Sequence, residues 1–297
     1  MQLKKAISLT IPSLVLAACD SPTQPESPQS TVTHIAFTSD REGNEDIYVL
    51  TPHDGSVRNL TNHSATDTDP DWSHDGNWIA FTSHREGNAD VFVMDADGGR
   101  IRNLTQHPEF DGFPDWSPDG TKIAFTSYRD GNSEIYVMDL TDGTVRNLTQ
   151  NAAFDILPVW SPDGSRIAFV SKRHQNWDLY LMDAAGGRLT RLTYDSGVDV
   201  EPTWSPDGCR IAFTSIRDGN DEIYVIDVDG GGLTRLTHNQ AFDGFPAWSP
   251  NGDGIAFTSV RDGNEEIYSM NPDGSGMRRL TTSPANDRFP RWRPRGR

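Results

Sequence analysis

The feature that most constrains the fold is a repeat of fixed length. The tripeptide Ile-Ala-Phe recurs every 44 residues, without an insertion, at Ile35, Ile79, Ile123, Ile167, Ile211 and Ile255. A period of this length is typical of four-stranded propeller blades, which bury their apolar faces only by packing on neighbouring blades. The chain is therefore expected to form a ring or a linear stack of similar β-units.

One repeat divides into four expected strands. They cover residues 114–117, 122–127, 134–139 and 144–149, and the segments between them contain Asp-Gly or Gly-Asn pairs. Such pairs suit turns that need a positive φ, while β-branched and aromatic residues fill the strands. No sustained helical period follows the N-terminal segment, so the chain is expected to be all-β.

The two ends of the repeat complement each other. The chain enters at the second strand of a unit, residues 34–39, and leaves after a lone first strand, residues 289–292. We predict a six-bladed propeller whose C-terminal strand joins the N-terminal blade, because closure removes exposed sheet edges. A linear β-solenoid is the alternative, but it would need capping units.

Several motifs carry a family resemblance. Pro-x-Trp-Ser-Pro-Asp-Gly, Ile-Ala-Phe-Thr-Ser and Asp-Gly-Asn-x-Glu-Ile-Tyr-Val-Met-Asp follow one another in register. This pattern resembles the TolB-type propeller repeat, and the resemblance extends over residues 33–297. It implies a propeller that binds a protein or a peptide. We expect the propeller alone, without the N-terminal α/β domain of TolB.

The N-terminus is expected to address the protein to the cell envelope. Residues 1–18 have a short basic region, an apolar run and the ending Leu-Ala-Ala before Cys19, which resembles a bacterial lipobox. We predict lipidation at Cys19; an ordinary signal peptide with an incidental Cys is the alternative. Residues 19–32 form an expected disordered, Pro/Ser-rich tether. The predicted location is extracytoplasmic and lipid-anchored, with the membrane leaflet left open.

The charge of the chain limits its partners. Lys and Arg number 26 against 43 Asp and Glu, which gives a formal net charge of −17. Such a chain repels nucleic acids and anionic membrane surfaces. We therefore expect an envelope protein or peptide as partner, no nucleic acid, and membrane contact through the N-terminal lipid only.

An Asp precedes the marker Trp of each first strand by five positions. These six residues are Asp67, Asp111, Asp155, Asp199, Asp243 and Asp287. They are expected at the same end of each blade as a repeated Arg: Arg41, Arg85, Arg129, Arg173, Arg217 and Arg261. We interpret the Asp set as a scaffold that locks neighbouring blades, because six uncompensated carboxylates would repel one another. A calcium site at the channel mouth is the alternative.

A binding surface is expected where the copies differ, because a partner lacks six-fold symmetry. The end of the ring that carries the connectors into the first strands, here called the connector face, holds six such candidates: Phe110, Tyr128, Phe154, Lys172, Ile216 and Phe242. Some of the Phe residues are alternatively expected to pack between blades. The fourth blade adds His174 and Trp177. Trp177 is either an interface anchor or fills space left by an altered turn.

The sequence contains no recognised catalytic pattern. Neither Gly-x-Ser-x-Gly, His-Glu-x-x-His nor Gly-x-Gly-x-x-Gly occurs, and no His pair has metal-ligand spacing. We predict a non-enzymatic binding module with no catalytic residues, no metal and no cofactor. The alternative is an envelope enzyme or carbohydrate-binding protein that uses the channel with calcium. The equivalence of the repeated acids disfavours this alternative, and the oligomeric state stays open.

Overall fold

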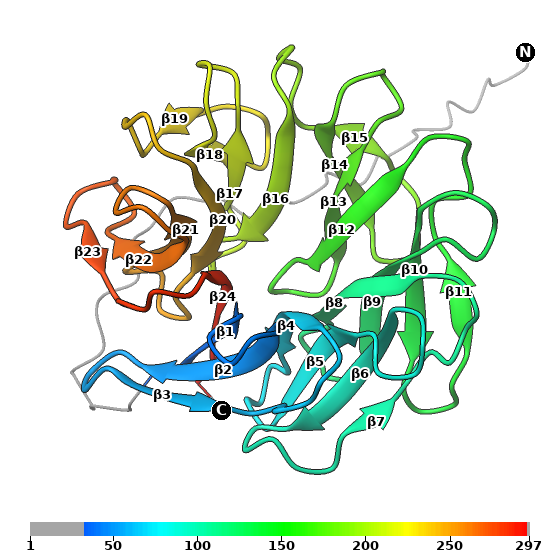
Figure 1. Cartoon of the computed structure of the whole chain (residues 1–297). Helices are drawn as coiled ribbons and strands as arrows, with labels where there is room; N and C mark the ends of the chain where they lie inside the picture. Colours follow the sequence, from blue (N-terminus) through cyan, green and yellow to red (C-terminus); the bar gives the residue numbers. More distant parts are fainter. Residues whose placement is uncertain (1–32, 296–297) are drawn as a thin grey trace, which may run out of the picture. The chain divides into compact units, whose positions relative to one another are not determined.

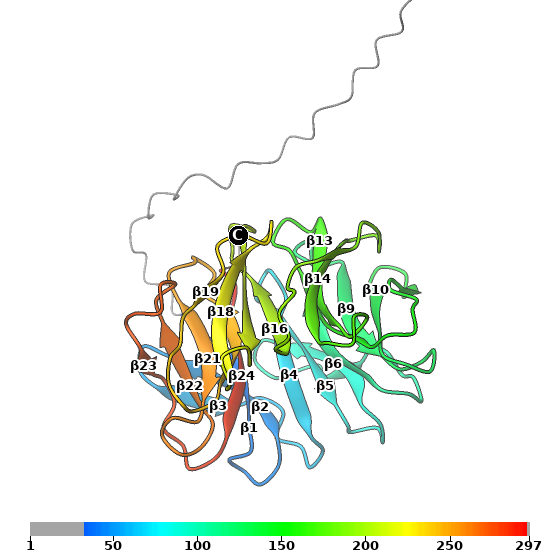
Figure 2. The same cartoon turned by 90° about the horizontal axis from the view of Figure 1, so that it is seen from above.

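The computed structural model describes residues 33–295, which form six four-stranded antiparallel sheets. The sheets surround a common centre as blades (Figure 1), and Figure 2 views the ring from its side. No helix occurs within residues 33–295, so this range contains no helical membrane span. The six-bladed propeller is confirmed. The predicted signal peptide, Cys19 and tether lie outside the described residues.

Each blade has an inner, a second, a third and an outer strand. The inner strands are β4 (Asp67–Trp72), β8 (Asp111–Trp116), β12 (Asp155–Trp160), β16 (Asp199–Trp204), β20 (Asp243–Trp248) and β24 (Asp287–Trp292). The second strands are β1 (Ile35–Ser39), β5 (Trp78–Ser83), β9 (Lys122–Ser127), β13 (Arg166–Ser171), β17 (Arg210–Ser215) and β21 (Ile255–Ser259). The third strands are β2 (Asp46–Thr51), β6 (Asp90–Asp95), β10 (Glu134–Asp139), β14 (Asp178–Asp183), β18 (Glu222–Asp227) and β22 (Glu266–Met270). The outer strands are β3 (Ser56–Asn59), β7 (Arg102–Asn103), β11 (Val145–Asn147), β15 (Thr190–Arg191), β19 (Thr234–Arg235) and β23 (Arg278–Arg279).

Blade 1 is built from both ends of the propeller, in the order β24-β1-β2-β3. Trp292 pairs with Ile35, and Arg293 donates a hydrogen bond of 2.9 Å to the carbonyl of Gly76 in blade 2. The C-terminal strand therefore closes the ring, as predicted, and the linear solenoid is excluded. Blades 2 to 6 begin with β4, β8, β12, β16 and β20.

The second and third strands of blade 3 match the prediction residue for residue. The inner strand β8 instead begins three residues earlier than expected, because Asp111 pairs with Ser127 of β9. The outer strand β11 is shorter than expected, since Val145–Asn147 packs on one strand only and has no neighbour beyond it.

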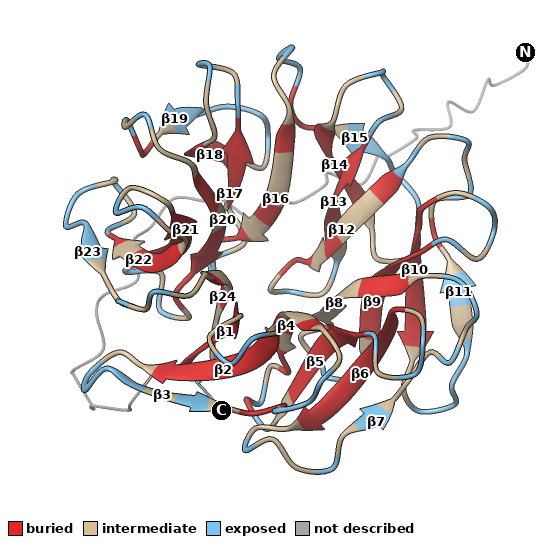
Figure 3. Cartoon of the chain, viewed as in Figure 1, coloured by how far each residue is buried: buried red, intermediate tan, exposed pale blue. Residues whose placement is uncertain are grey.

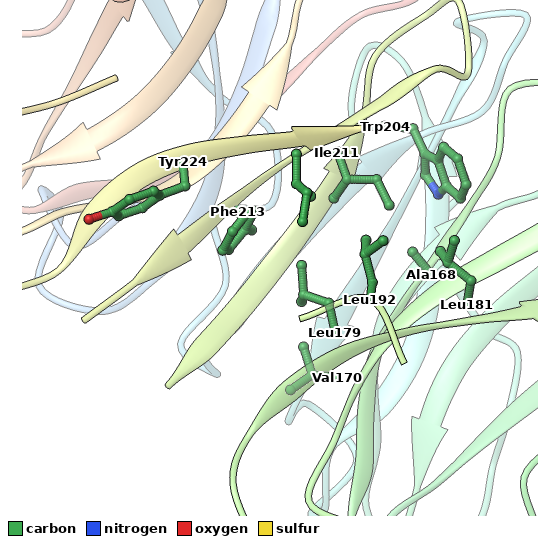
Figure 4. Packing of buried hydrophobic residues seen from close by; sticks show 10 residues of the cluster. Ala168, Val170, Leu179, Leu181, Leu192, Trp204, Ile211, Phe213 and Tyr224 are labelled. Atoms are coloured by element: carbon green, nitrogen blue, oxygen red, sulfur yellow. The ribbon is translucent and has the colours of Figure 1, made fainter. Parts of the chain in front are cut away.

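The apolar core lies between adjacent blades. The second strands are buried along nearly their whole length and the outer strands are mostly exposed (Figure 3). One cluster joins Val170 and Leu181 of blade 4 to Trp204, Ile211 and Phe213 of blade 5 (Figure 4). Because both faces of a blade meet a neighbour, the strands contain continuous apolar runs rather than an alternating pattern.

Every inner strand contains a bulge that shapes the centre of the ring. In β8 the pairing register shifts between Gly112 and Asp115. The residue three positions before each marker Trp has φ between 54° and 59°: Asp69, Phe113, Leu157, Glu201, Phe245 and Phe289. All six of these residues line the central cavity. A positive φ on a residue other than Gly costs about 1 kcal/mol or more. The surrounding structure therefore stabilises this conformation in each of the six blades.

Candidate functional site

The six repeated Asp side chains are fully buried and bonded. Each forms an ion pair of 2.6–2.8 Å with the repeated Arg of its own blade. Arg129, for example, pairs with Asp111 and lies over the rings of Phe125 and Tyr136. The pairs hold the inner strand to the end of the second strand within one blade, rather than joining neighbouring blades as expected. Arg41 and Asp287 make the same pair across the ring closure.

The candidate loop residues of blade 3 form an aromatic cluster on the connector face. Tyr128 is 39% exposed. Its ring meets that of Phe110 edge-on at 5.4 Å, and Phe110 in turn lies 5.7 Å from Phe113, which lines the channel. Phe242 contacts the channel residue Phe245 in the same way, at 5.8 Å. The loop aromatics are therefore continuous with the channel wall.

Blades 4 and 5 place the remaining candidates on the same face. Phe154 and Ile216 are 43% and 38% exposed. Trp177 lies 6.4 Å from the ring of Phe154, and the Lys172 ammonium is 5.5 Å from the Trp177 ring centre. Trp177 is half-buried against the core between blades 4 and 5. It is thus both a surface and a packing residue.

His174 has a structural partner. Its Nδ1 hydrogen-bonds to the hydroxyl of Tyr180. In blades 3, 5 and 6 the equivalent Tyr instead donates to an Asp at the position of His174. The altered turn nevertheless keeps its backbone bond, because the amide of Gln175 donates to the carbonyl of Lys172 at 3.0 Å.

The inner strands enclose a cavity of about 240 Å³ at the centre of the ring. Three carboxylates line it: Asp69, Asp115 and Glu201. Much of the remaining wall is apolar: Phe113, Ile156, Leu157, Val159, Phe245 and Phe289. Arg291 of the closing strand is the only basic side chain in this lining of described residues. The channel thus has an anionic side and an aromatic side.

Burial dominates the electrostatics of these carboxylates and of Asp71, whose charge acts on Asp115. It raises the pKa of Asp71 to about 6 and that of Glu201 to about 7, although Arg291 opposes both shifts. Burial also raises the pKa of Asp115 well above its usual value, and the nearby charge of Asp71 adds to this rise. One guanidinium therefore does not compensate the carboxylates around it.

The channel carboxylates were missed by the sequence interpretation, which considered only acids repeated in all copies. The sequence does show that the residue types one and three positions before the marker Trp differ from blade to blade. The position directly before the marker Trp holds Asp, Asp, Val, Thr, Ala and Arg in blades 2, 3, 4, 5, 6 and 1, in that order. Comparing the copies there would have indicated an asymmetric channel.

The opposite end of the channel has a different lining. A cavity of about 460 Å³ is bordered there by the six marker Trp residues and by the Pro residues that follow them in the turns. Asp115 lines both cavities, so it lies at the middle level of the channel, and Asp71 lines only this second cavity. Among residues 33–295, no group of three or more His, Cys, Asp and Glu side chains is arranged to hold a metal ion.

The model of the TolB β-propeller domain family matches residues 23–111, 105–198 and 195–297. No curated protein sequence matches the chain. Among solved structures, TolB from Acinetobacter baumannii is 25% identical with a TM-score of 0.81, over 89% of this chain and 67% of that one. A putative TolB from Agrobacterium tumefaciens is 26% identical with a TM-score of 0.72, over 87% and 90% of the two chains.

Similar propellers also occur in enzymes. An oligogalacturonate lyase from Vibrio parahaemolyticus is 15% identical with a TM-score of 0.57, over 83% of this chain and 74% of that one. At this identity the likeness concerns the fold alone.

Proposed function

Because the chain belongs to the TolB β-propeller domain family, we propose that it is a non-enzymatic, lipid-anchored envelope protein that binds a protein or peptide at its connector face. The exposed aromatic cluster around blades 3 to 5 carries this proposal. Tyr128, Phe154 and Ile216 are large apolar side chains on loops, where a lone folded chain gains little from them. Aromatic residues with a half-buried Trp are typical of binding hot spots.

Lys172 and Trp177 set the expected centre of this surface. The ammonium over the indole ring presents a cation beside an apolar face. Both lie beside Phe154, whose backbone carbonyl accepts a hydrogen bond of 2.9 Å from the amide of Lys172.

The test measures partner capture from envelope extract and melting temperature on the same variants. Trp177→Ala is expected to weaken capture more than tenfold, since an anchor Trp commonly contributes about 2 kcal/mol or more. Trp78→Ala is the matched control, because Trp78 begins β5 at the opposite end of the ring. A Trp177→Ala protein that is destabilised but captures its partner normally would refute this choice of surface.

A second candidate function uses the channel. The unequal carboxylates Asp69, Asp115 and Glu201 supply the asymmetry that an enzyme or carbohydrate-binding protein needs, with calcium as the proposed ion. Calcium-dependent hydrolysis or binding of an envelope glycan, lost in Asp115→Asn, would favour it over the protein-binding proposal.

A further inference from the structure

The central cavity divides into two chemically different sides. Blade 2 contributes Asp69 from β4, and blade 3 contributes Asp115 from β8. Asp71 of β4 lines the adjoining cavity, which Asp115 also borders. Blades 6 and 1 contribute Phe245 and Phe289, whose rings meet edge-on at 4.4 Å. A ligand in this cavity would thus touch carboxylates on one side and aromatic faces on another.

Two of the carboxylates have oxygens that the protein does not use. Asp115 Oδ2 accepts a hydrogen bond of 2.7 Å from the amide of Trp160, and Glu201 Oε2 accepts bonds from Thr214 and Phe245. No donor within residues 33–295 bonds Asp115 Oδ1 or Glu201 Oε1. Because both side chains line the cavity, these two oxygens are open to a donor that enters it.

The wall favours an organic cation over a metal ion. The carboxylates come from three blades and, together with the other described residues, do not converge into a metal-binding group. A metal ion would gain nothing from Phe245 and Phe289, whereas an ammonium or guanidinium group is attracted by aromatic faces and its carbon stem by apolar ones.

We infer that this cavity binds an ammonium or guanidinium group on a short apolar stem. Each inner strand runs from the connector face toward its marker Trp, so Phe245 and Phe289 lie nearer that face than Asp71 and Asp115. The stem packs on the two Phe rings and the cation reaches the two Asp carboxylates. A Lys or Arg side chain of the partner is one source of this group, which rests on the proposed function; a free amine is the other.

The first test uses the full chain and three probes of equal length, followed by ligand-observed NMR and calorimetry. Hexylammonium is expected to bind at least tenfold more tightly than hexanol, and hexanoate is expected not to bind. Equal binding of hexanol and hexylammonium would overturn the inference. So would calcium binding that hexylammonium does not displace, because the carboxylates would then form a metal site.

Two variants locate the site. Asp71→Asn with Asp115→Asn removes both charges and keeps an acceptor for the amides of Trp116 and Trp160. It is expected to weaken hexylammonium binding at least tenfold, whereas Glu109→Gln, on an exposed connector loop, leaves it unchanged. If the double variant does not fold, Arg291→Gln provides the test. Removing the Arg291 guanidinium from the cavity should strengthen hexylammonium binding. Unchanged or weaker binding by Arg291→Gln would overturn the inference.

Peptide probes separate the two sources of the cation. Tighter binding of acetyl-Phe-Lys-amide than of hexylammonium supports a partner side chain, and the reverse order supports a free amine. Failure of every cationic probe, with partner capture still dependent on Trp177, would refute the channel inference and leave the proposed function intact. Cation binding without such capture would refute the proposed surface alone.

Discussion

The burial of Glu201 makes a quantitative prediction about stability and pH. Its Oε2 accepts bonds from the Thr214 hydroxyl at 2.6 Å and the Phe245 amide at 2.8 Å. Burial raises its pKa from 4.5 to about 7. A rise of this size corresponds to a change of roughly 3 kcal/mol in the free energy of unfolding. Because the carboxylate borders a cavity that water can enter, we expect a smaller change in the free energy of unfolding, about 2 kcal/mol.

The sign follows from the protonation states. A carboxyl whose pKa is higher in the folded protein favours folding when protonated, so its contribution is complete below about pH 4.5. That contribution is lost as the pH rises from 4.5 through 7. Glu201→Gln keeps the acceptor for both hydrogen bonds and cannot ionise. The variant should therefore match the wild type at pH 4 and exceed it by about 2 kcal/mol at pH 8.

The assay is urea unfolding, followed by Trp fluorescence, at several pH values between 4 and 8. The difference between variant and wild type isolates Glu201, because the other channel carboxylates titrate in both proteins. Glu109→Gln is the control and should show no difference that changes with pH. A difference for Glu201→Gln that stays constant from pH 4 to pH 8 would refute the assignment of the raised pKa.

Three further predictions test the scaffold and the N-terminus. Ending the chain before Arg288 removes most of β24 and should abolish cooperative unfolding or cause aggregation; a truncated protein that melts like the full chain would contradict ring closure. Asp111→Ala should cost about 3 kcal/mol in urea unfolding because it leaves Arg129 unpaired, and adding Arg129→Met should recover part of the loss; a loss below about 1 kcal/mol would show that the pair is dispensable. Cys19→Ser should abolish lipid attachment and membrane association, and unchanged mass and fractionation would refute lipidation.

Repetition let much of the fold be predicted from sequence. The 44-residue spacing, the turn residues and the complementary ends specify equal blades and ring closure, because these are local or periodic properties of the chain. The second and third strands of blade 3 were predicted to the residue. Asp111 and Arg129 were placed at one end of a blade for the same reason, since alternating strands bring their loops together.

The contacts that define the candidate sites required the tertiary structure. Asp69, Asp115 and Arg291 come from three blades, and Glu201 from a fourth, so their common environment exists only after the ring closes. The positive φ at Glu201 also follows no local sequence rule, because Asp, Phe and Leu occupy the same position in other blades. Sequence thus determined the repeated scaffold, through periodicity and turn chemistry. Tertiary packing alone decided which of the unrepeated side chains meet in the channel and how far burial shifts their pKa values.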